Sequence, residues 1–395
     1  MVSVWPTARL GDVIDLFDSQ RIPLNSRQRQ ERQGRFPYYG AQGIIDHIDD
    51  YIFDGRYILV AEDGENLNSK KLPLALFATG KFWVNNHAHI LRGKPGIADD
   101  GFLLACINNA DIKPFVTGAA QPKLSQGNLR LIEIPLPSLP MQRRIASILS
   151  AYDDLIENSQ RRIKILESMA RALYREWFVH FRFPGHENHP RVASPLGEIP
   201  EGWEVRSAPG CVEINPRVTV PREGDKPFVP MGCLSNDSML ITEIETRAGN
   251  SGSRFQNGDT LFARITPCLE NGKTGYVQFL PNANSVAFGS TEFIVLRSRT
   301  LTPEFIYLLA RSDEFRGLAI KSMSGATGRQ RVQEQCFNDF QIVQPPRVLL
   351  ERFSSIVAPC FRLIFRLHSQ IENLRRTRDL LLPRLLSGQL DAQHN

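Results

Sequence analysis

The sequence contains an internal duplication, which limits the folds that the chain can adopt. When the chain is aligned with itself at an offset of 208 positions, ten residues are identical without a gap. These identities lie between 134 and 173 in the first copy and between 342 and 381 in the second. Farther upstream, Lys123 aligns with Arg331. The duplication predicts two related modules, each followed by a segment of the same kind.

The duplicated segments carry apolar residues at heptad spacing, which is typical of long helices that pair in a coiled coil. The predicted seam of the first helix comprises Ile145, Leu149, Ile156, Ile163, Leu166 and Leu173. The matching seam of the second helix comprises Phe353, Val357, Ile364, Ile371, Leu374 and Leu381. Prolines precede both segments, as suits the approach to a helix. Pro359 lies inside the second segment and is expected to kink it.

The remaining sequence alternates short β-rich runs with glycine turns and short helical stretches, which indicates mixed α/β modules. Two helices that leave successive modules and pair with each other must run antiparallel. One module then lies at each end, with an approximate twofold axis between them, an arrangement that suits a DNA site with two separated halves. The predicted fold class is α+β, with two similar mixed α/β domains joined by two long antiparallel coiled-coil helices.

The predicted boundaries follow from this order. They are a first domain at 1–140, a first long helix at 141–182, a linker at 183–197, a second domain at 198–345, a second long helix at 346–389 and a tail at 390–395. Within the domains, strands are expected at 57–60 and 292–296 and helices at 101–109 and 303–312, the last with Thr302 as its N-cap.

The composition permits a nucleic-acid partner without requiring one. The net charge is +5 and the sequence pI about 8.9, a mildly basic balance that suits an acidic partner. The six cysteines lack the close spacing of a zinc site and are expected to be reduced thiols in the cytoplasm. No apolar run approaches the roughly 20 residues that span a bilayer, so no membrane partner is expected.

The sequence offers no convincing catalytic motif. Residues 270–274 resemble the end of a phosphate-binding loop, but Pro267 stands where the first glycine should be and supplies no N–H. A DNA methyltransferase would need an Asn/Asp-Pro-Pro-aromatic loop and a glycine-rich cofactor loop, and neither is present. Asp99, Asp100 and Asp111 form a nuclease-like set only at the level of chance. We therefore expect no catalytic residue and no metal site in this chain.

Several stretches together resemble the specificity subunits of type I restriction–modification systems. They are Ile134-Pro-Leu-Pro-Ser-Leu-Pro-Met-Gln-Arg-Arg-Ile-Ala-Ser-Ile-Leu149, Pro195-Leu-Gly-Glu-Ile-Pro-Glu-Gly-Trp203, the segments 261–273, 325–332 and 380–388, and, in the first module, 38–41 and 121–124. The resemblance covers essentially the whole chain, and its order matches the duplication. Two departures are Gln344-Pro345-Pro346, where the first copy has Leu136-Pro137, and Pro359 within the second helix.

The resemblance implies a non-catalytic subunit whose two target-recognition domains each recognise one half of a bipartite DNA site. The long helices would set the spacing between the halves. It also implies two methyltransferase subunits that use S-adenosylmethionine and two restriction subunits that use ATP and Mg²⁺, with no cofactor bound by this chain. Three alternatives stay open: a specificity subunit whose partner fuses methylation and cleavage, a stand-alone DNA nuclease, and a structural coiled-coil scaffold.

Base recognition needs side chains with paired donors or acceptors: Arg or Lys for guanine, Asn or Gln for adenine. The second-module candidates are Thr327, Arg329, Gln330, Arg331, Arg264, Asn271 and Lys273. Through the duplication, Gln121 and Lys123 are predicted to be the first-module counterparts of Arg329 and Arg331. Tyr38, Arg56 and Lys81 are further candidates in the first module.

Overall fold

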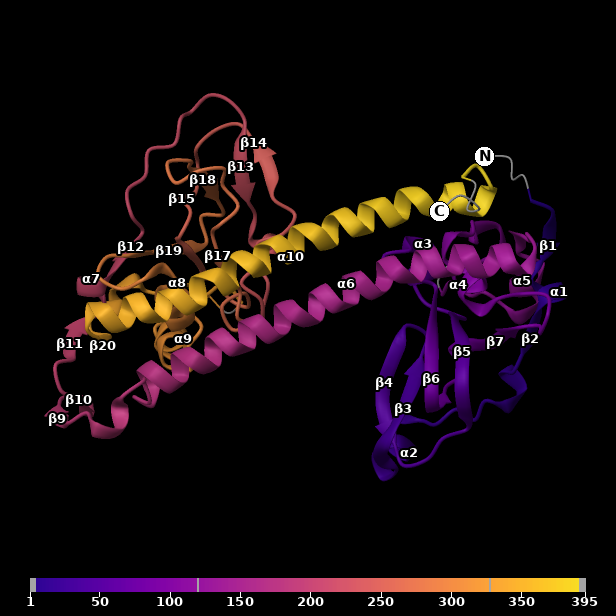
Figure 1. Cartoon of the computed structure of the whole chain (residues 1–395), viewed down its shortest axis with the longest axis horizontal. Helices are drawn as coiled ribbons and strands as arrows, with labels where there is room; N and C mark the ends of the chain where they lie inside the picture. Colours follow the sequence, from indigo (N-terminus) through magenta and orange to yellow (C-terminus); the bar gives the residue numbers. More distant parts are fainter. Residues whose placement is uncertain (1–4, 119–120, 327, 391–395) are drawn as a thin grey trace. The chain divides into compact units, whose positions relative to one another are not determined.

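The structure is a computed structural model that describes residues 5–118, 121–326 and 328–390. It divides into two compact units (Figure 1). Unit 1 comprises Met1–Glu157 and Glu372–Asn395, and unit 2 comprises Asn158–Ile371. The two long helices, α6 (Leu139–Tyr174) and α10 (Arg347–Ser387), each contribute residues to both units.

Unit 1 is built on a six-stranded sheet in the order β2-β7-β5-β6-β3-β4. Its strands are β2 (Ile14–Leu16), β7 (Ala88–Gly93), β5 (Phe53–Ala61), β6 (Ala75–Val84), β3 (Gln33–Gly40) and β4 (Gly43–Ile48). Neighbours are antiparallel except for β3 and β6. A separate antiparallel pair joins β1 (Thr7–Arg9) to β8 (Glu133–Pro135). The helices outside α6 and α10 are α1 (Leu10–Val13), α2 (Ser26–Glu31), α3 (Asn66–Ser69), α4 (Asp100–Asn109) and α5 (Gln126–Leu131).

Unit 2 holds two four-stranded sheets. The first, β12-β19-β16-β17, comprises β12 (Val212–Ile214), β19 (Phe293–Ser298), β16 (Thr260–Ala263) and β17 (Thr274–Tyr276). The second, β14-β13-β18-β15, comprises β14 (Glu245–Arg247), β13 (Lys226–Val229), β18 (Ala287–Gly289) and β15 (Ser253–Phe255). Two further pairs are β9 (Arg191–Ser194) with β10 (Gly197–Pro200), and β11 (Glu204–Ser207) with β20 (Gln341–Gln344). The short helices are α7 (Ala208–Cys211), α8 (Pro303–Ala310) and α9 (Asp313–Lys321).

The duplication seen in the sequence is a duplication of framework. The antiparallel run β2-β7-β5-β6 in unit 1 has the same order and directions as β12-β19-β16-β17 in unit 2. In each unit a short helix, α1 or α7, directly precedes the edge strand β2 or β12. The strand just before the long helix, β8 or β20, pairs with a strand near the start of the domain, β1 or β11. These repeated features confirm the prediction of two related mixed α/β modules.

The long helices form the predicted elements and pack by the predicted faces. In α6 and α10, eight of the proposed seam residues are buried: Ile145, Leu149, Ile156, Ile163, Phe353, Val357, Ile364 and Ile371. The other four, Leu166, Leu173, Leu374 and Leu381, are partly buried. Within unit 1, Leu149 shares a hydrophobic cluster with Leu385, and Arg378 near the middle of the same α10 segment pairs with Asp153. The two helices therefore run antiparallel there.

Polar side chains anchor α6 to each unit. Gln142 is buried in unit 1, where its amide nitrogen donates to the carbonyls of Ile97 and Pro137 and its oxygen accepts from the Asp99 N–H. In unit 2, buried Glu167 accepts hydrogen bonds at 2.7 and 2.8 Å from the Ser238 hydroxyl and the Met239 N–H.

Most shorter elements lie where the sequence predicted them. The helix expected at 101–109 is α4, and the helix expected at 303–312 is α8, with Thr302 as its N-cap. α8 ends at Ala310 because Ser312 instead caps α9 by accepting a hydrogen bond from the Phe315 N–H. The stretch predicted as a linker includes the start of a β9–β10 hairpin. α10 continues as helix through Pro359.

Two remaining expectations concern the chain end and the membrane. The predicted tail at 390–395 lies, apart from Leu390, outside the described residues. Among the helices that the structure describes, none combines the length and apolarity required to cross a membrane.

Candidate nucleic-acid interface

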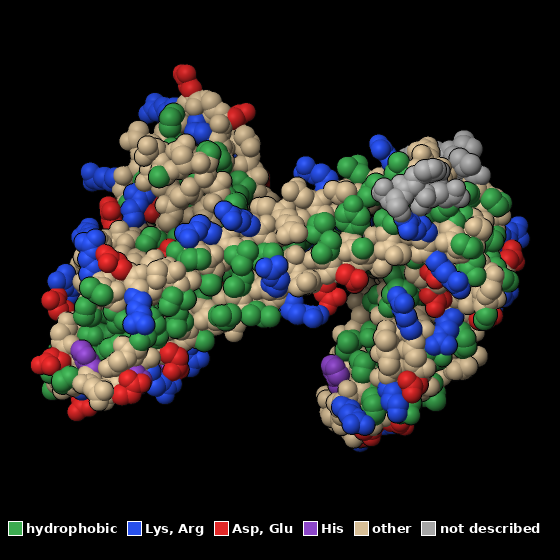
Figure 2. All heavy atoms as spheres, viewed as in Figure 1, with side chains coloured by type: hydrophobic (Ala, Val, Ile, Leu, Met, Phe, Trp, Pro, Cys, Tyr) green, Lys and Arg blue, Asp and Glu red, His purple; other side chains and the backbone are tan. Residues whose placement is uncertain are grey.

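Basic side chains are dispersed over the visible surface and do not gather in one patch. On the face shown in Figure 2, lysines and arginines alternate with acidic and apolar side chains over both units. On this face, charge alone therefore does not mark an interface, and the local geometry of the predicted recognition residues has to locate it.

A short loop in each unit is closed by two backbone hydrogen bonds. In unit 2, the Arg331 N–H donates to the Ser324 carbonyl at 2.9 Å, and the Ser324 N–H donates back to the Arg331 carbonyl at 3.1 Å. In unit 1, Lys123 and Thr117 exchange the same two bonds at 2.7 and 2.8 Å. Arg331 and Lys123 each also form a β-bridge just beyond an inner strand. Arg331 bridges to Ile265, two positions after β16, and Lys123 bridges to Asp63, two positions after β5. Lys123 and Arg331 are therefore structural counterparts, as the duplication predicted.

The inner strands extend this correspondence. The Glu62 N–H donates to the His87 carbonyl in unit 1, and the Arg264 N–H donates to the Glu292 carbonyl in unit 2. Glu62 thus corresponds to Arg264, and His87 corresponds to Glu292. The backbone is shared while the charge at both positions differs, so the two units present different chemistry on one framework.

In unit 2, the loop arginine is held by a carboxylate from the neighbouring strand end. Arg331 donates through Nε and Nη2 to both oxygens of Glu292, at 2.6 to 3.0 Å. These bonds lower the pKa of the Glu292 carboxyl below its ordinary value. Arg264 pairs with Glu334 at 3.0 Å. Three of the predicted residues, Arg264, Gln330 and Arg331, therefore lie together, since Gln330 also exchanges hydrogen bonds with Thr266 in the adjoining segment.

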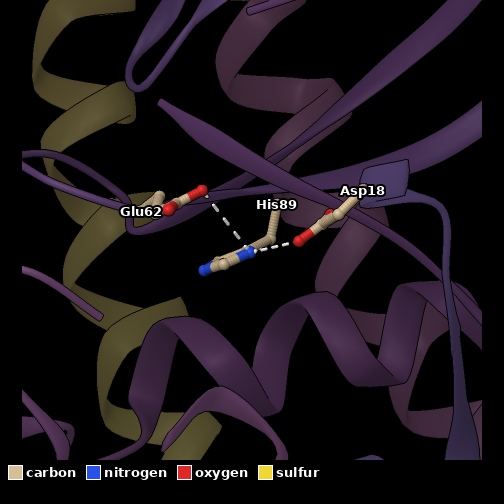
Figure 3. Close-up of side chains that lie close together, drawn as sticks. All are labelled: Asp18, Glu62 and His89. Atoms are coloured by element: carbon tan, nitrogen blue, oxygen red, sulfur yellow. Dashed lines mark hydrogen bonds and ion pairs between the residues drawn. The ribbon is translucent and has the colours of Figure 1, made fainter. Parts of the chain in front are cut away.

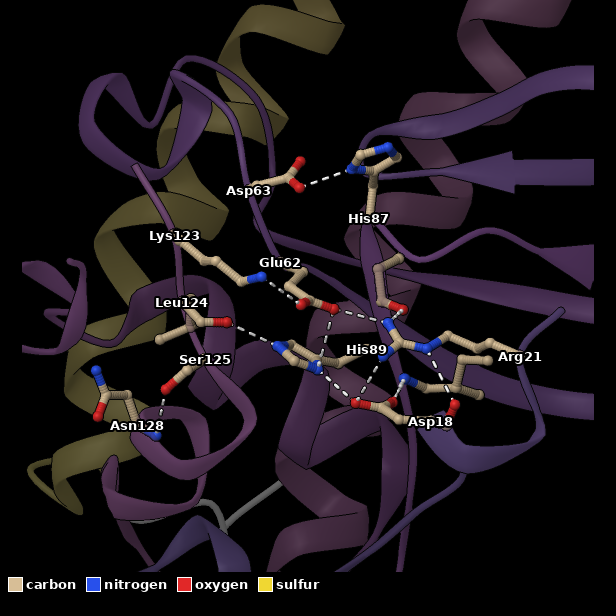
Figure 4. A network of polar contacts seen from close by, with 12 residues as sticks. Asp18, Arg21, Glu62, Asp63, His87, His89, Lys123, Leu124, Ser125 and Asn128 are labelled. Carbon is tan, nitrogen blue, oxygen red and sulfur yellow. Dashed lines mark hydrogen bonds and ion pairs between the residues drawn. The ribbon is translucent and has the colours of Figure 1, made fainter. Parts of the chain in front are cut away.

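In unit 1, the corresponding region is an ion-pair network. Figure 3 shows buried His89 between Asp18 and Glu62, with Nδ1 at 2.6 Å from Asp18 Oδ2 and 3.8 Å from Glu62 Oε2. Figure 4 adds the cations around Glu62: Arg21 Nη1 lies 2.7 Å from Oε2, and Lys123 Nζ lies 3.2 Å from Oε1. The predicted recognition residue Lys123 is thus paired with an internal acid, as Arg331 is in unit 2.

Asp18, Glu62 and His89 lie close enough to be considered as metal ligands, since their ligand atoms are within 4.8 Å of one another. The donor set does not fit a metal ion. His89 Nε2 lies 2.8 Å from the Leu124 carbonyl, which only accepts, so this nitrogen carries a hydrogen. Nδ1 faces a carboxylate, and Arg21 already supplies positive charge between the two acids. The cluster is therefore an internally neutralised network.

The network favours the charged carboxylates despite their burial. Burial acts to raise the pKa of Asp18, but hydrogen bonds from His89 and the Ile90 N–H outweigh it and leave the pKa lowered. Burial likewise opposes ionisation of Glu62, and the Arg21 hydrogen bond with the charges of His89 and Arg21 leaves its pKa lowered. Both acids are thus held as carboxylates by cations of the same unit.

The other unit 2 candidates are divided between structural and accessible positions. Lys273 donates from Nζ to the Met231 carbonyl at 3.0 Å, so its ammonium holds a turn. Asn271 and Arg329 are exposed. Thr327 lies outside the described residues.

The unit 1 candidates do not all converge. Gln121 is exposed on the Lys123 loop. Arg56 and Lys81 are exposed farther away along β5 and β6, where Arg56 covers the Phe77 ring and Lys81 the Tyr51 ring. Tyr38 is fully buried, and its hydroxyl accepts a hydrogen bond from the Leu24 N–H at 2.9 Å. A base contact by Tyr38 is therefore incompatible with this structure, because its ring packs in the core against Ile48 and Trp83.

Sequence reasoning missed two arginines in unit 2. Arg217 and Arg254 line a cleft of about 520 Å³ together with Arg264. Arg217 follows β12, and Arg254 lies in β15 and donates from Nη1 to the Val218 carbonyl at 3.2 Å. Neither has an ion-pair partner among the described residues. The sequence alone gave no signal for these two arginines. The change from an acid in unit 1 (Glu62) to a base in unit 2 (Arg264) points to this region, but the two positions are recognised as equivalent only once the strands are aligned in the structure.

The carboxylates considered for a nuclease have structural partners. Asp99 caps α4 by accepting from the Phe102 N–H, and Asp100 accepts from the Gly93 N–H at 2.7 Å. Asp111 accepts from the Lys113 N–H. These roles explain the three residues without a metal-dependent reaction.

Comparison with known proteins agrees with this geometry. The family model of the type I restriction modification DNA specificity domain matches residues 3–168. A type I restriction enzyme specificity subunit of Methanocaldococcus jannaschii is 30% identical over 296 residues, which cover 71% of this chain and 66% of that protein. A putative specificity subunit of Haemophilus influenzae is 27% identical over 294 residues, covering 73% of this chain and 72% of that protein.

This chain belongs to the type I restriction–modification specificity subunits. The fold of this chain also resembles that of a solved specificity subunit. The crystal structure of a type I restriction–modification S subunit from M. genitalium superposes with a TM-score of 0.64, covering 97% of this chain and 96% of that one at 13% identity. As a specificity subunit, the chain is a non-catalytic member of its complex, in agreement with the structural roles of its candidate acids.

Proposed function

We propose that this specificity subunit recognises a bipartite, asymmetric site in double-stranded DNA, with one half recognised by each unit. The observation that carries the proposal is the repeated double bridge at Lys123 and Arg331, which presents a basic loop residue from the same framework in both units. The surrounding side chains differ: Glu62 and His87 in one unit stand where Arg264 and Glu292 stand in the other. One scaffold with two sets of side chains suits two different half-sites.

In this proposal, methylation and cleavage of DNA are carried out by partner subunits in the cytoplasm. Two methyltransferase subunits bring S-adenosylmethionine, and two restriction subunits bring ATP and Mg²⁺. Docking of these subunits would cover exposed apolar residues on the long helices. They are Leu155, Ile165 and Met169 on α6 and Val348, Ile356 and Leu380 on α10.

The test is methylation mapping. The chain and its methyltransferase partner are expressed in a host that lacks DNA methylation, and modified bases are sequenced genome-wide. We expect one two-part motif with a fixed gap. Gln121→Ala with Lys123→Ala should alter one half of the motif only, and Gln330→Ala with Arg331→Ala should alter the other half only. Arg222→Ala, on an exposed loop of unit 2, is the control and should leave the motif unchanged.

Two results contradict the proposal. One is a complex that methylates without a two-part motif, and the other is a pair of loop variants that change the same half. DNA cleavage by the purified chain alone would instead establish an enzyme.

A further inference from the structure

The two units differ most where one has a cleft and the other has a buried network. The Asn215 N–H donates to the Val295 carbonyl in unit 2, and the Phe17 N–H donates to the Ile90 carbonyl in unit 1. The segments that follow are therefore counterparts. In unit 1 this segment supplies Asp18 and Arg21 to the ion-pair network, whereas in unit 2 it supplies the wall of the cleft.

The charge of the cleft points to an anionic ligand. Its lining contains three arginines, Arg217, Arg254 and Arg264, and no carboxylate. Arg264 is paired with Glu334, but its Nε is buried and has no hydrogen-bond partner among the described residues. A buried donor without an acceptor is costly, so a small shift of this side chain toward an anion in the cleft would be favoured. Arginine guanidinium groups bind phosphate through charge-assisted, often bidentate, hydrogen bonds.

The cleft adjoins the proposed base-recognition loop. The Val332 N–H donates to the Arg264 carbonyl at 2.9 Å, so Arg264 connects the cleft wall with the loop segment that carries Arg331. Thr291 also lines the cleft and immediately precedes Glu292, the carboxylate that holds Arg331. An anion in the cleft would therefore lie near Arg331, the side chain proposed to contact a base, and phosphate contacts of this kind fix the register of a protein on DNA.

We propose that the cleft binds one phosphate of the DNA backbone through Arg217 and Arg254, with Arg264 completing the site, and so fixes the register of the Arg331 loop on its half-site. The inference rests on the proposed function, which it deepens. Unit 1 fills the corresponding position with Asp18 and Glu62, which already pair with Arg21 and His89 and so leave no free guanidinium for a phosphate. The two half-sites are therefore held differently: one with this phosphate contact and one without it.

The first test is the salt dependence of binding. The complex of this chain with its methyltransferase is titrated with a duplex that carries the mapped motif, over a series of salt concentrations. Arg217→Gln with Arg254→Gln should reduce the slope of log Kd against log salt by about 0.9, the value for one phosphate contact. Binding at low salt should weaken roughly tenfold or more. Arg222→Gln is the matched control, since it removes one exposed arginine outside the cleft lining.

The second test locates the phosphate. Single phosphates of the duplex are replaced by neutral methylphosphonate, and each duplex is measured with wild-type and double-variant complexes. We expect one position, in the half-site that responds to Arg331, to weaken the wild type and to have no further effect on the variant. Such coupling identifies a contact even if the variant is less stable overall, because stability alone does not depend on which phosphate is neutral.

Two outcomes overturn the inference: an unchanged salt slope in the double variant, and the absence of any coupled phosphate. If the slope is unchanged and the double variant also loses a thermal shift that inorganic phosphate gives the wild type, the cleft binds a free anion instead. In either case, wild-type binding to the motif leaves the proposed function intact. Failure of the wild type to prefer the motif would contradict that function instead.

Discussion

Lys123 and Arg331 occupy equivalent backbone positions, but each is neutralised by an acid from a different place. The acid for Lys123 is Glu62, at the end of the inner strand, whereas the acid for Arg331 is Glu292, beside the neighbouring strand. Both loop side chains are about half exposed, so these ion pairs contribute little stability in water. If Lys123 and Arg331 contact DNA as proposed, the ion pairs orient each basic group beforehand, and the base competes with the internal carboxylate.

Arg331→Lys tests whether this orientation matters for specificity. Lysine keeps the positive charge but loses the planar fork that Arg331 uses toward Glu292 and would use toward a guanine. We expect discrimination against single-base changes in the unit 2 half-site to fall by about 1–3 kcal/mol. Competition binding with substituted duplexes measures it. Unaltered discrimination, or an equal loss in both half-sites, would remove Arg331 from base recognition.

Asp18 and Glu62 give unit 1 an acid-sensitive stability. Their carboxyls have pKa values lowered from the ordinary 3.8 and 4.5. At acidic pH the unfolded chain therefore binds more protons than the folded one. Their stabilising contribution is present above the ordinary pKa values and is lost as pH falls through the lowered ones.

Urea unfolding followed by hydrogen exchange in unit 1 provides the measurement. The wild-type midpoint should fall as pH decreases below about 4.5, the ordinary glutamate value. Asp18→Asn should lower the midpoint at neutral pH, because His89 loses its charged partner, and should lose less stability on acidification. If the variant and the wild type lose equal stability between neutral and acidic pH, Asp18 is not a source of the dependence.

At the level of elements, α6 is positioned by a few buried polar contacts as well as by its seam. The buried side chain of Gln142 satisfies three backbone groups of unit 1. We expect Gln142→Ala to lower the free energy of unfolding by about 1–3 kcal/mol, the cost of buried groups left without partners. Hydrogen exchange at the Asp99 amide, which donates to Gln142 Oε1, should accelerate.

Gln160→Ala is the control for that change. Gln160 lies on the exposed face of the same helix, so the substitution has the same chemistry without the buried contacts. Equal destabilisation by the two variants would mean that helix propensity, and not the anchor, explains the result.

The elements that sequence predicted well are those governed by local pattern. Heptad spacing located α6 and α10, and Thr302 before an apolar run located the start of α8. The interface was harder to predict because it depends on which strands become neighbours. Arg254 in β15 and Arg217 after β12 are separated in sequence, and only the fold places both in one cleft. The burial of Tyr38 could not be predicted for the same reason, since its ring packs against Ile48 of β4 and Trp83 of β6.

On the scale of the whole chain, duplication has conserved the backbone framework while the charges have diverged. The four-strand order and the loop bridges are common to both units. By contrast, Glu62 against Arg264 reverses the charge at one position, and a buried network in one unit corresponds to a cleft in the other. Under the proposed function, divergence of this kind would let each unit acquire its own half-site without altering the fold, and fold resemblance alone therefore does not identify the bases recognised.

This separation predicts that the two units contribute independently to the affinity for DNA. Lys123 and Arg331 share no hydrogen-bond or ion-pair partner in the described residues. For sites without shared partners, changes in free energy usually add within about 0.3–0.5 kcal/mol. We therefore expect Lys123→Gln and Arg331→Gln, combined in one chain, to weaken binding of the full motif by the product of their single fold-changes. Competition titrations of the methyltransferase complex measure all three variants. A combined loss well below that product would show that the loss of one half-site already releases the other, and that the units engage DNA as a single cooperative site.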